Sequence, residues 1–270
     1  MTGAADPVGL DLHAYLRRIR YAGPLAPTRA TLEALHLAHA TAIPFENLDI
    51  LLGRPIRLDL ASLQAKLVAG ARGGYCFEQN ALFAAALERI GFGVTRLAAR
   101  VRLGTERVLP RTHMTLLVAA DGVEVLADVG FGADGLLLPV PLGGRAVPQF
   151  AWTYRVAEAG GAYALQTLRD GAWQDLYAFT REPQLPVDYE IANHYTSTHP
   201  ASRFTLVLTA QRLATDVRRT LRNRVYSEDR GAEVATRTLA SDDEILDVLA
   251  TEFGLAFPRG TRFGYDGGAD

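Results

Sequence analysis

Hydrophobic residues recur every three or four positions along the first third of the chain, which is the period of helices with one buried face. Capping residues and helix breakers mark where these segments begin and end. Thr28 and Asp59 precede the second and third segments, and Gly70 and Gly91 follow the third and fourth. The pattern predicts helices over residues 12–19, 28–43, 59–70 and 76–91.

The hydrophobic pattern changes in the middle third to short runs that are typical of strands. Turn residues separate these runs, among them the pairs Asp121-Gly122 and Gly160-Gly161. Several short strands at this spacing favour an antiparallel barrel or sandwich. The predicted strands cover residues 94–103, 113–119, 123–129, 150–157, 163–168 and 172–179.

The last third mixes the two patterns. A capping box of Ser241 and Glu244 precedes a terminal helix that reaches Phe253. Upstream of it, the pattern predicts one short helix over residues 187–195 and strands over 204–209, 217–226 and 232–238. The whole chain is therefore predicted to be an α+β protein.

Composition narrows the class of protein without pointing to a function. Hydrophobic residues make up 49% of the 270 residues, and the net charge is -2 with histidines neutral. So small a charge gives no general attraction to nucleic acid or to an anionic membrane. No window approaches the roughly 20 apolar residues that span a bilayer, and the N-terminus shows no signal-peptide pattern. We therefore expect a soluble, cytoplasmic protein that binds neither nucleic acid nor membrane.

The single cysteine of the chain, Cys76, is the first candidate for chemistry. It follows Gly73 and Gly74, which allow a tight turn, and it begins a predicted helix. Unpaired N–H groups and the helix dipole favour an anion at that position, and so favour the nucleophilic thiolate. The same N–H groups can stabilise the oxyanion that forms when a thiolate attacks a carbonyl. A lone cysteine is also often an inert core residue, and the residues around Cys76 leave both interpretations open.

A cysteine nucleophile usually needs a base and a group that orients the base. His113 begins one predicted strand, and Asp128 lies near the end of the strand that returns from the turn at Asp121-Gly122. A two-residue turn brings His113 and Asp128 close together at one end of this hairpin. Without the hairpin, Asp128 would be interpreted as a turn residue before Gly130.

Two other histidines offer a metal site as an alternative chemistry. His36 and His39 are three residues apart, so they can share one face of a helix. Zinc needs further ligands at suitable spacing, and Cys76 lies in no such pattern. We therefore expect both histidines to be core or surface residues, and we expect no metal.

Taken together, these motifs resemble the arylamine N-acetyltransferase family in its bacterial form. Their order along the chain is that of the family, and they extend from the N-terminal helices into the last third. The Arg-Gly-Gly-aromatic-Cys run is the most specific of them. The matching segments are Ile43-Pro44-Phe45-Glu46-Asn47-Leu48, Arg72-Gly73-Gly74-Tyr75-Cys76-Phe77-Glu78, His113-Met114-Thr115-Leu116, Asp128-Val129-Gly130-Phe131-Gly132 and, more weakly, Ser197-Thr198-His199-Pro200 with Ser202 and Phe204.

The resemblance implies an α+β multidomain fold of three packed units. These would be a helical bundle carrying the nucleophile, an antiparallel β-barrel carrying the other two triad residues, and an α/β lid. The units would cover residues 1–90, 91–190 and 191–270. The resemblance also implies a structural pair between Glu46 and Arg72 that braces the catalytic loop.

The implied reaction is a ping-pong transfer of acetyl from acetyl-coenzyme A, through an acetyl-cysteine, to an arylamine, arylhydroxylamine or hydrazine. A cysteine-protease-like triad carries over onto Cys76, His113 and Asp128. No metal takes part, and the enzyme is compatible with a homodimer. Coenzyme A contacts would fall at Gly130, Phe131, Gly132 and Phe204, and acceptor contacts at Phe45 and Phe131.

Three alternatives use or retain the same residues. An amide synthase of polyketide biosynthesis would load a long acyl chain on Cys76 and close a macrolactam. A thioester hydrolase would pass the acyl group to water. An inactive binding protein is the third, and the intact set of Cys76, His113 and Asp128 argues against it.

Overall fold

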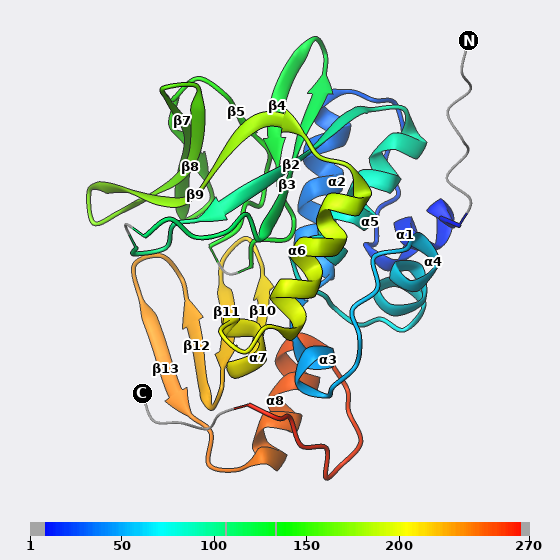
Figure 1. Ribbon diagram of the computed structural model, residues 1–270, viewed down its shortest axis with the longest axis vertical. Coiled ribbons are helices and arrows are strands. Elements are labelled where there is room, and N and C mark those ends of the chain that lie inside the picture. Colours follow the sequence, from blue (N-terminus) through cyan, green and yellow to red (C-terminus); the bar gives the residue numbers. More distant parts are fainter. Residues whose placement is uncertain (1–8, 106, 133, 266–270) are drawn as a thin grey trace.

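The first third of the computed structural model is helical, as the hydrophobic period predicts (Figure 1). The structure describes residues 9–105, 107–132 and 134–265. Its first elements are α1 (Leu12–Arg18), α2 (Arg29–Ala42), α3 (Leu48–Leu51), α4 (Leu60–Leu63), the π-helical η1 (Gln64–Ala69) and α5 (Cys76–Ile90). The side chains of Thr28 and Asp59 accept backbone N–H bonds at the starts of α2 and α4. Gly91 ends α5 in the left-handed conformation, with a φ of 108°.

The strands of the middle third form an eight-stranded sheet in the order β5-β4-β3-β2-β9-β8-β7-β6. Every neighbouring pair is antiparallel. A bridge between Leu142 and Val156 brings one edge of the sheet against β7, so that the sheet is a nearly closed barrel. The strands are β2 (Gly93–Val101), β3 (His113–Ala120), β4 (Val123–Ala127), β5 (Val140–Pro141), β6 (Val147–Gln149), β7 (Trp152–Ala159), β8 (Ala162–Arg169) and β9 (Ala172–Pro183).

The last third supplies most of a second, five-stranded antiparallel sheet in the order β1-β10-β11-β12-β13. In Figure 1 this orange sheet lies below the green barrel sheet, and α6 crosses beside both. Its edge strand β1 (Phe45–Glu46) comes from the first third of the chain. The remaining elements are α6 (Pro186–Thr198), α7 (Arg203–Leu206), β10 (Thr209–Leu213), β11 (Arg218–Arg222), β12 (Val225–Asp229), β13 (Val234–Thr238) and α8 (Asp242–Phe253).

Two predictions for the last third are wrong. A strand was expected over residues 204–209, but residues 204–206 belong to α7 and only Thr209 belongs to a strand, β10. The Ser202 side chain accepts the Phe204 N–H and so caps a helical turn. Residues 217–226, expected to be one strand, are the two strands β11 and β12. They are joined by a tight turn in which Asn223 has a φ of 51°. Asparagine tolerates this left-handed conformation, and the hydrophobic pattern runs through the turn without a break.

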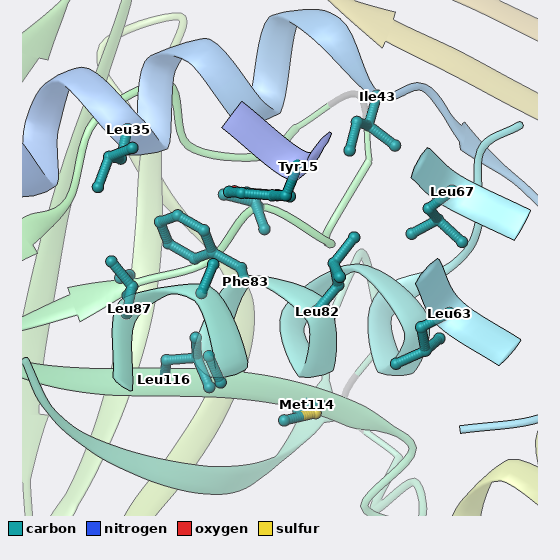
Figure 2. Close-up of a cluster of buried hydrophobic side chains, with 14 of the residues drawn as sticks. Tyr15, Leu35, Ile43, Leu63, Leu67, Leu82, Phe83, Leu87, Met114 and Leu116 are labelled. Atoms are coloured by element: carbon teal, nitrogen blue, oxygen red, sulfur yellow. The ribbon is translucent and has the colours of Figure 1, made fainter. Parts of the chain in front are cut away.

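A buried cluster fixes α5 against β3, the two elements that begin at Cys76 and His113 (Figure 2). Leu35 of α2 packs on one side of α5, and Leu116 of β3 packs on the other. Phe83 of α5 lies between them and is completely buried. Burying one such side chain stabilises a fold by roughly 1.5–3 kcal/mol, so the relative position of α5 and β3 is firmly held.

The division into units at residues 90 and 190 stays a prediction. The strand β1 of the first unit pairs with β10 of the last, with Phe45 opposite Gln211. Within the described residues, no helix is long and apolar enough to cross a membrane.

Candidate active site

Cys76 is the first residue of α5. Just before it, the backbone at Gly73 passes very close to the backbone at Pro44. A Cβ on Gly73 would lie 2.2 Å from the carbonyl oxygen of Pro44, so only glycine fits there. The Glu46 N–H donates to the Gly74 carbonyl at 3.1 Å, which ties the turn to β1. Cys76 is 3% exposed, and its Sγ lies 3.7 Å from the Thr112 carbonyl oxygen. The thiol is therefore held at a helix start, where an anion is favoured.

Ion pairs between largely buried side chains stabilise the turn that precedes Cys76. Arg72 pairs with Glu46 at 2.6 Å, which confirms the structural pair that the family resemblance implies. Lys66, the single lysine of the chain, lies 2.9 Å from Asp49 and 2.7 Å from Glu78. Burial lowers the pKa of Lys66, but the three surrounding carboxylates outweigh burial and raise it. Lys66 therefore stays charged and neutralises the acidic groups beneath the turn.

Replacing Lys66 with methionine is expected to destabilise the protein by about 3–5 kcal/mol, because it leaves buried Glu78 without its cation. Urea unfolding followed by circular dichroism measures this change. Arg54→Met is the matched control, since Arg54 contacts the same Asp49 carboxylate from an exposed position. That exposed pair is worth about 0–1 kcal/mol. Equal losses in the two variants would contradict a special role for Lys66.

The β3–β4 hairpin brings His113 and Asp128 together as the turn at Asp121-Gly122 predicts. His113 opens β3, and Asp128 directly follows β4. The Nε2 of His113 lies 2.6 Å from the Oδ2 of Asp128. Both side chains are buried, and the aspartate is completely so. This separation is that of a charge-assisted hydrogen bond.

The charge state of His113 follows from its neighbours. Burial lowers the pKa of His113, but the charge of Asp128, its hydrogen bond, and the hydrogen bond and charge of Cys76 outweigh burial. Together they raise the pKa of His113 to about 10. For Asp128, burial raises the pKa, and His113 and further hydrogen bonds lower it below its ordinary value. At neutral pH the arrangement is therefore an imidazolium bound to a carboxylate, with the sulfur of Cys76 beside the imidazolium.

Asn80 holds Asp128 in place, a contact that the sequence analysis did not identify. Its Nδ2 donates to the Oδ1 of Asp128 at 2.9 Å and to the Met114 carbonyl at 2.7 Å. Its Oδ1 accepts the Val129 N–H at 3.1 Å. Asn80 lies four residues after Cys76, which places both on the same face of α5. That spacing is the one sequence signal that would have indicated it.

The helical histidines are core residues, as expected. His36 and His39 are completely buried, and burial lowers their pKa to about 4 and about 3. The Asp128 N–H donates to Nε2 of His36 at 3.1 Å, so the Nδ1 of His36 donates to the Leu137 carbonyl. Neutral His36 thus fixes the backbone at Asp128. Within the described ranges, no group of three or more His, Cys, Asp or Glu side chains is arranged to hold a metal ion.

A cavity of about 310 Å³ opens over Cys76 and His113. Its walls are mainly apolar, and they include all three phenylalanines that the sequence singled out, Phe45, Phe131 and Phe204. The rings of Phe131 and His113 are 5.1 Å apart, and those of Phe45 and Phe204 are 6.0 Å apart. The cavity therefore joins the thiol to an aromatic wall that suits a flat apolar ligand.

The glycines after Asp128 serve different purposes. Gly130 lines the cavity, and a Cβ there would lie 2.8 Å from the Cα of Cys76. Gly132 is not among the lining residues. It has a φ of 93°, and a Cβ on it would lie 1.9 Å from the Oε1 of Gln211. The lack of a side chain at Gly130 therefore lets the segment after β4 pack closely against Cys76. The lack of one at Gly132 lets the same segment pack closely against Gln211 of β10.

Comparison with known proteins identifies the class of enzyme to which this chain belongs. A family model described as N-acetyltransferase matches residues 28–261, so the chain is an acyltransferase. The arylamine N-acetyltransferase of Mycolicibacterium smegmatis is 39% identical over 255 residues, which cover 92% of this chain and 93% of that protein. The chain belongs to the arylamine N-acetyltransferase family.

Solved structures agree with this assignment. The arylamine N-acetyltransferase of Nocardia farcinica is 42% identical, with a TM-score of 0.88, and the match covers 94% of this chain and 92% of that one. A Mycobacterium marinum arylamine N-acetyltransferase in complex with CoA is 36% identical, with a TM-score of 0.86. That match covers 91% of this chain and 93% of the other. The barrel and second sheet described above are thus the fold of this family.

Proposed function

We propose that the protein transfers an acetyl group from acetyl-coenzyme A to arylamines, arylhydroxylamines or hydrazines by a ping-pong mechanism. One observation carries the proposal: Cys76, at a helix start, lines the same aromatic cavity as His113, which is hydrogen-bonded to the buried Asp128. In this mechanism Cys76 is the nucleophile, His113 moves the proton, and Asp128 orients His113. The CoA complex of the M. marinum relative supports the choice of donor.

In the first half-reaction, the Cys76 thiolate attacks the carbonyl carbon of the acetyl thioester. Backbone N–H groups at the start of α5 have no partner within the helix, so they stabilise the oxyanion. The carbon–sulfur bond of the donor then breaks, and the His113 imidazolium gives its proton to the departing sulfur. The products are acetyl-Cys76, the free thiol of coenzyme A and a neutral His113.

In the second half-reaction, the amine nitrogen attacks the carbonyl carbon of acetyl-Cys76. Neutral His113 accepts a proton from that nitrogen, and the bond from carbon to Sγ breaks. The amide leaves, and the pair of thiolate and imidazolium is restored. No net charge or proton is left over, so the cycle closes.

The cavity supports an aromatic acceptor for two reasons. Phe45, Phe131 and Phe204 offer ring surfaces to a flat substrate. Aromatic amines are also weak bases, so their neutral, nucleophilic form dominates at neutral pH. A largely buried site also keeps water from acetyl-Cys76, and hydrolysis is the reaction that competes with transfer.

Rapid mixing of the protein with acetyl-coenzyme A, without an amine, tests this proposal. We expect a burst of free thiol equal in amount to the enzyme, and the mass of one acetyl group on the peptide that contains Cys76. Adding an arylamine or hydrazine should then remove the acetyl group and yield the amide.

A panel of acyl-coenzyme A donors against arylamines and hydrazines tests the assigned substrates. Absence of acetyl-Cys76 would reject the mechanism. Acyl hydrolysis that exceeds transfer at saturating amine would favour a thioester hydrolase instead. Failure with acetyl-coenzyme A, together with loading of long acyl thioesters, would favour an amide synthase.

A further inference from the structure

A second cavity, of about 260 Å³, adjoins the first and differs from it in chemistry. Both cavities are lined by Phe45, Leu103, Phe131, Arg203 and Phe204, so they lie side by side along one shared wall. The added walls of the second cavity are polar and come mostly from the five-stranded sheet. They are Asp134, Thr209, Gln211, Thr220 and Arg222.

The strand register explains why these polar residues share one surface. Thr209 of β10 lies opposite Arg222 of β11, and Gln211 lies opposite Thr220. Alternate residues of a strand point to the same face, so all four side chains belong to one face of the sheet. The hydroxyl of Thr209 is buried and has no hydrogen-bond partner. Because such groups are nearly always satisfied, this hydroxyl indicates that a ligand completes the site.

Two arginines give this surface an unbalanced positive charge. Burial lowers the pKa of Arg203, and the nearby charge of Arg222 lowers it further. Within the described part of the chain, neither Arg203 nor Arg222 forms an ion pair, whereas Arg219 of β11 and Arg230, just after β12, pair with Glu228. Among the described residues that line this cavity, only Asp134 carries a carboxylate, and Arg169 and Arg218 already bind it. The two guanidinium groups are therefore available to an external anion.

We propose that Arg203 and Arg222 bind the pyrophosphate of acetyl-coenzyme A, with Thr209 as a further hydrogen-bonding group. This assignment rests on the proposed function. The pantetheine arm then follows the shared wall of Phe45 and Phe204 toward Cys76. The pyrophosphate, rather than the 3′-phosphate, is chosen because it is joined directly to the pantetheine arm. Guanidinium groups suit it, because their fork of N–H groups matches phosphate oxygens.

The test compares three acetyl donors, namely acetyl-coenzyme A, acetyl-dephospho-coenzyme A and S-acetylpantetheine. We measure the ratio of kcat/KM for each phosphate-bearing donor to kcat/KM for S-acetylpantetheine. Arg203→Gln and Arg222→Gln are each expected to lower this ratio by about tenfold, and the double variant by about 100-fold. Both phosphate-bearing donors should lose equally, because both retain the pyrophosphate. Arg230→Gln is the matched control, since it removes an exposed arginine at the end of β12, outside the cavity, and should leave the ratio unchanged.

Three outcomes would overturn the assignment. An equal loss with all three donors would mean that the arginines support folding or acyl transfer itself. A loss confined to acetyl-coenzyme A would move the contact to the 3′-phosphate, and an unchanged kcat/KM with all three donors would exclude the arginines. Failure of the proposed function is distinguishable, because the unchanged protein would then form no acetyl-Cys76 from any of the donors.

Discussion

Replacing Cys76 with alanine is expected to lower kcat/KM for acetyl transfer by at least about 10⁴-fold. The proposed mechanism carries the acetyl group on Sγ, so without the thiol the donor and the amine would have to react directly. Release of coenzyme A in the presence of an arylamine measures the rate, with enough enzyme to detect a small residual activity. The burst of free thiol should disappear together with the steady-state activity.

Loss of folding would not explain this result. Cys76→Ala removes one buried sulfur atom, which costs about 1 kcal/mol of stability, and the thermal transition should move little. Cys76→Ser is the matched variant, because it keeps the size of the side chain but replaces the thiol with a hydroxyl that does not ionise near neutral pH. Both variants should still bind coenzyme A, measured by calorimetry. Activity close to that of the unchanged protein would contradict a covalent role for Cys76.

The parts of the site that were predictable from the sequence depend on local geometry. The hairpin places His113 beside Asp128 because a two-residue turn fixes the register of its two strands, and the structure confirms their contact. The glycines before Cys76 similarly predict a tight turn followed by a helix start, and α5 begins at that residue. Caps and breakers likewise placed α2, the consecutive α4 and η1, and α8 within a few residues of their observed bounds.

The parts that were not predictable depend on contacts between distant segments. Nothing local brings Cys76 to His113, 37 positions later; the packing of α5 on β3 through Phe83 and Leu116 does so. The role of Asn80 appears only once both elements are in place. The second cavity depends on β1 and β10 pairing from opposite ends of the chain. The hydrophobic period of a segment says nothing about which distant segment it contacts. The order of the family motifs along the chain was the only sequence feature that indicated the proximity of Cys76 and His113.

The second large effect is expected at Asp128, where asparagine should lower kcat/KM by about 10³–10⁴-fold while leaving the fold intact. The Oδ1 of Asp128 accepts N–H bonds from Asn80 and Gly130, and an asparagine oxygen can continue to accept both. The amide nitrogen would then face Nε2 of His113 and donate to it. That reversal moves the imidazole proton to the other ring nitrogen, so His113 can no longer accept a proton from the amine.

A pH titration separates this mechanism from simple damage to the site. The folded protein holds a proton on His113 up to about pH 10, against an ordinary pKa of 6.5. The stabilisation that this proton provides is therefore complete below about pH 6.5 and is lost as the pH rises toward about 10. Asp128 is the main group that raises the pKa of His113, so Asp128→Asn should flatten the fall in unfolding free energy across this window.

The matched control is Asp121→Asn, at the opposite end of the same hairpin, where the carboxylate accepts the Arg29 N–H from an exposed position. It makes the same chemical change at a site that does not contact His113, so both activity and pH dependence should persist. Chemical unfolding at several pH values and steady-state kinetics together measure the two effects. An Asp128→Asn protein with unchanged kcat/KM would show that His113 needs no orienting carboxylate, and Asp128 would then be a structural residue of the hairpin end.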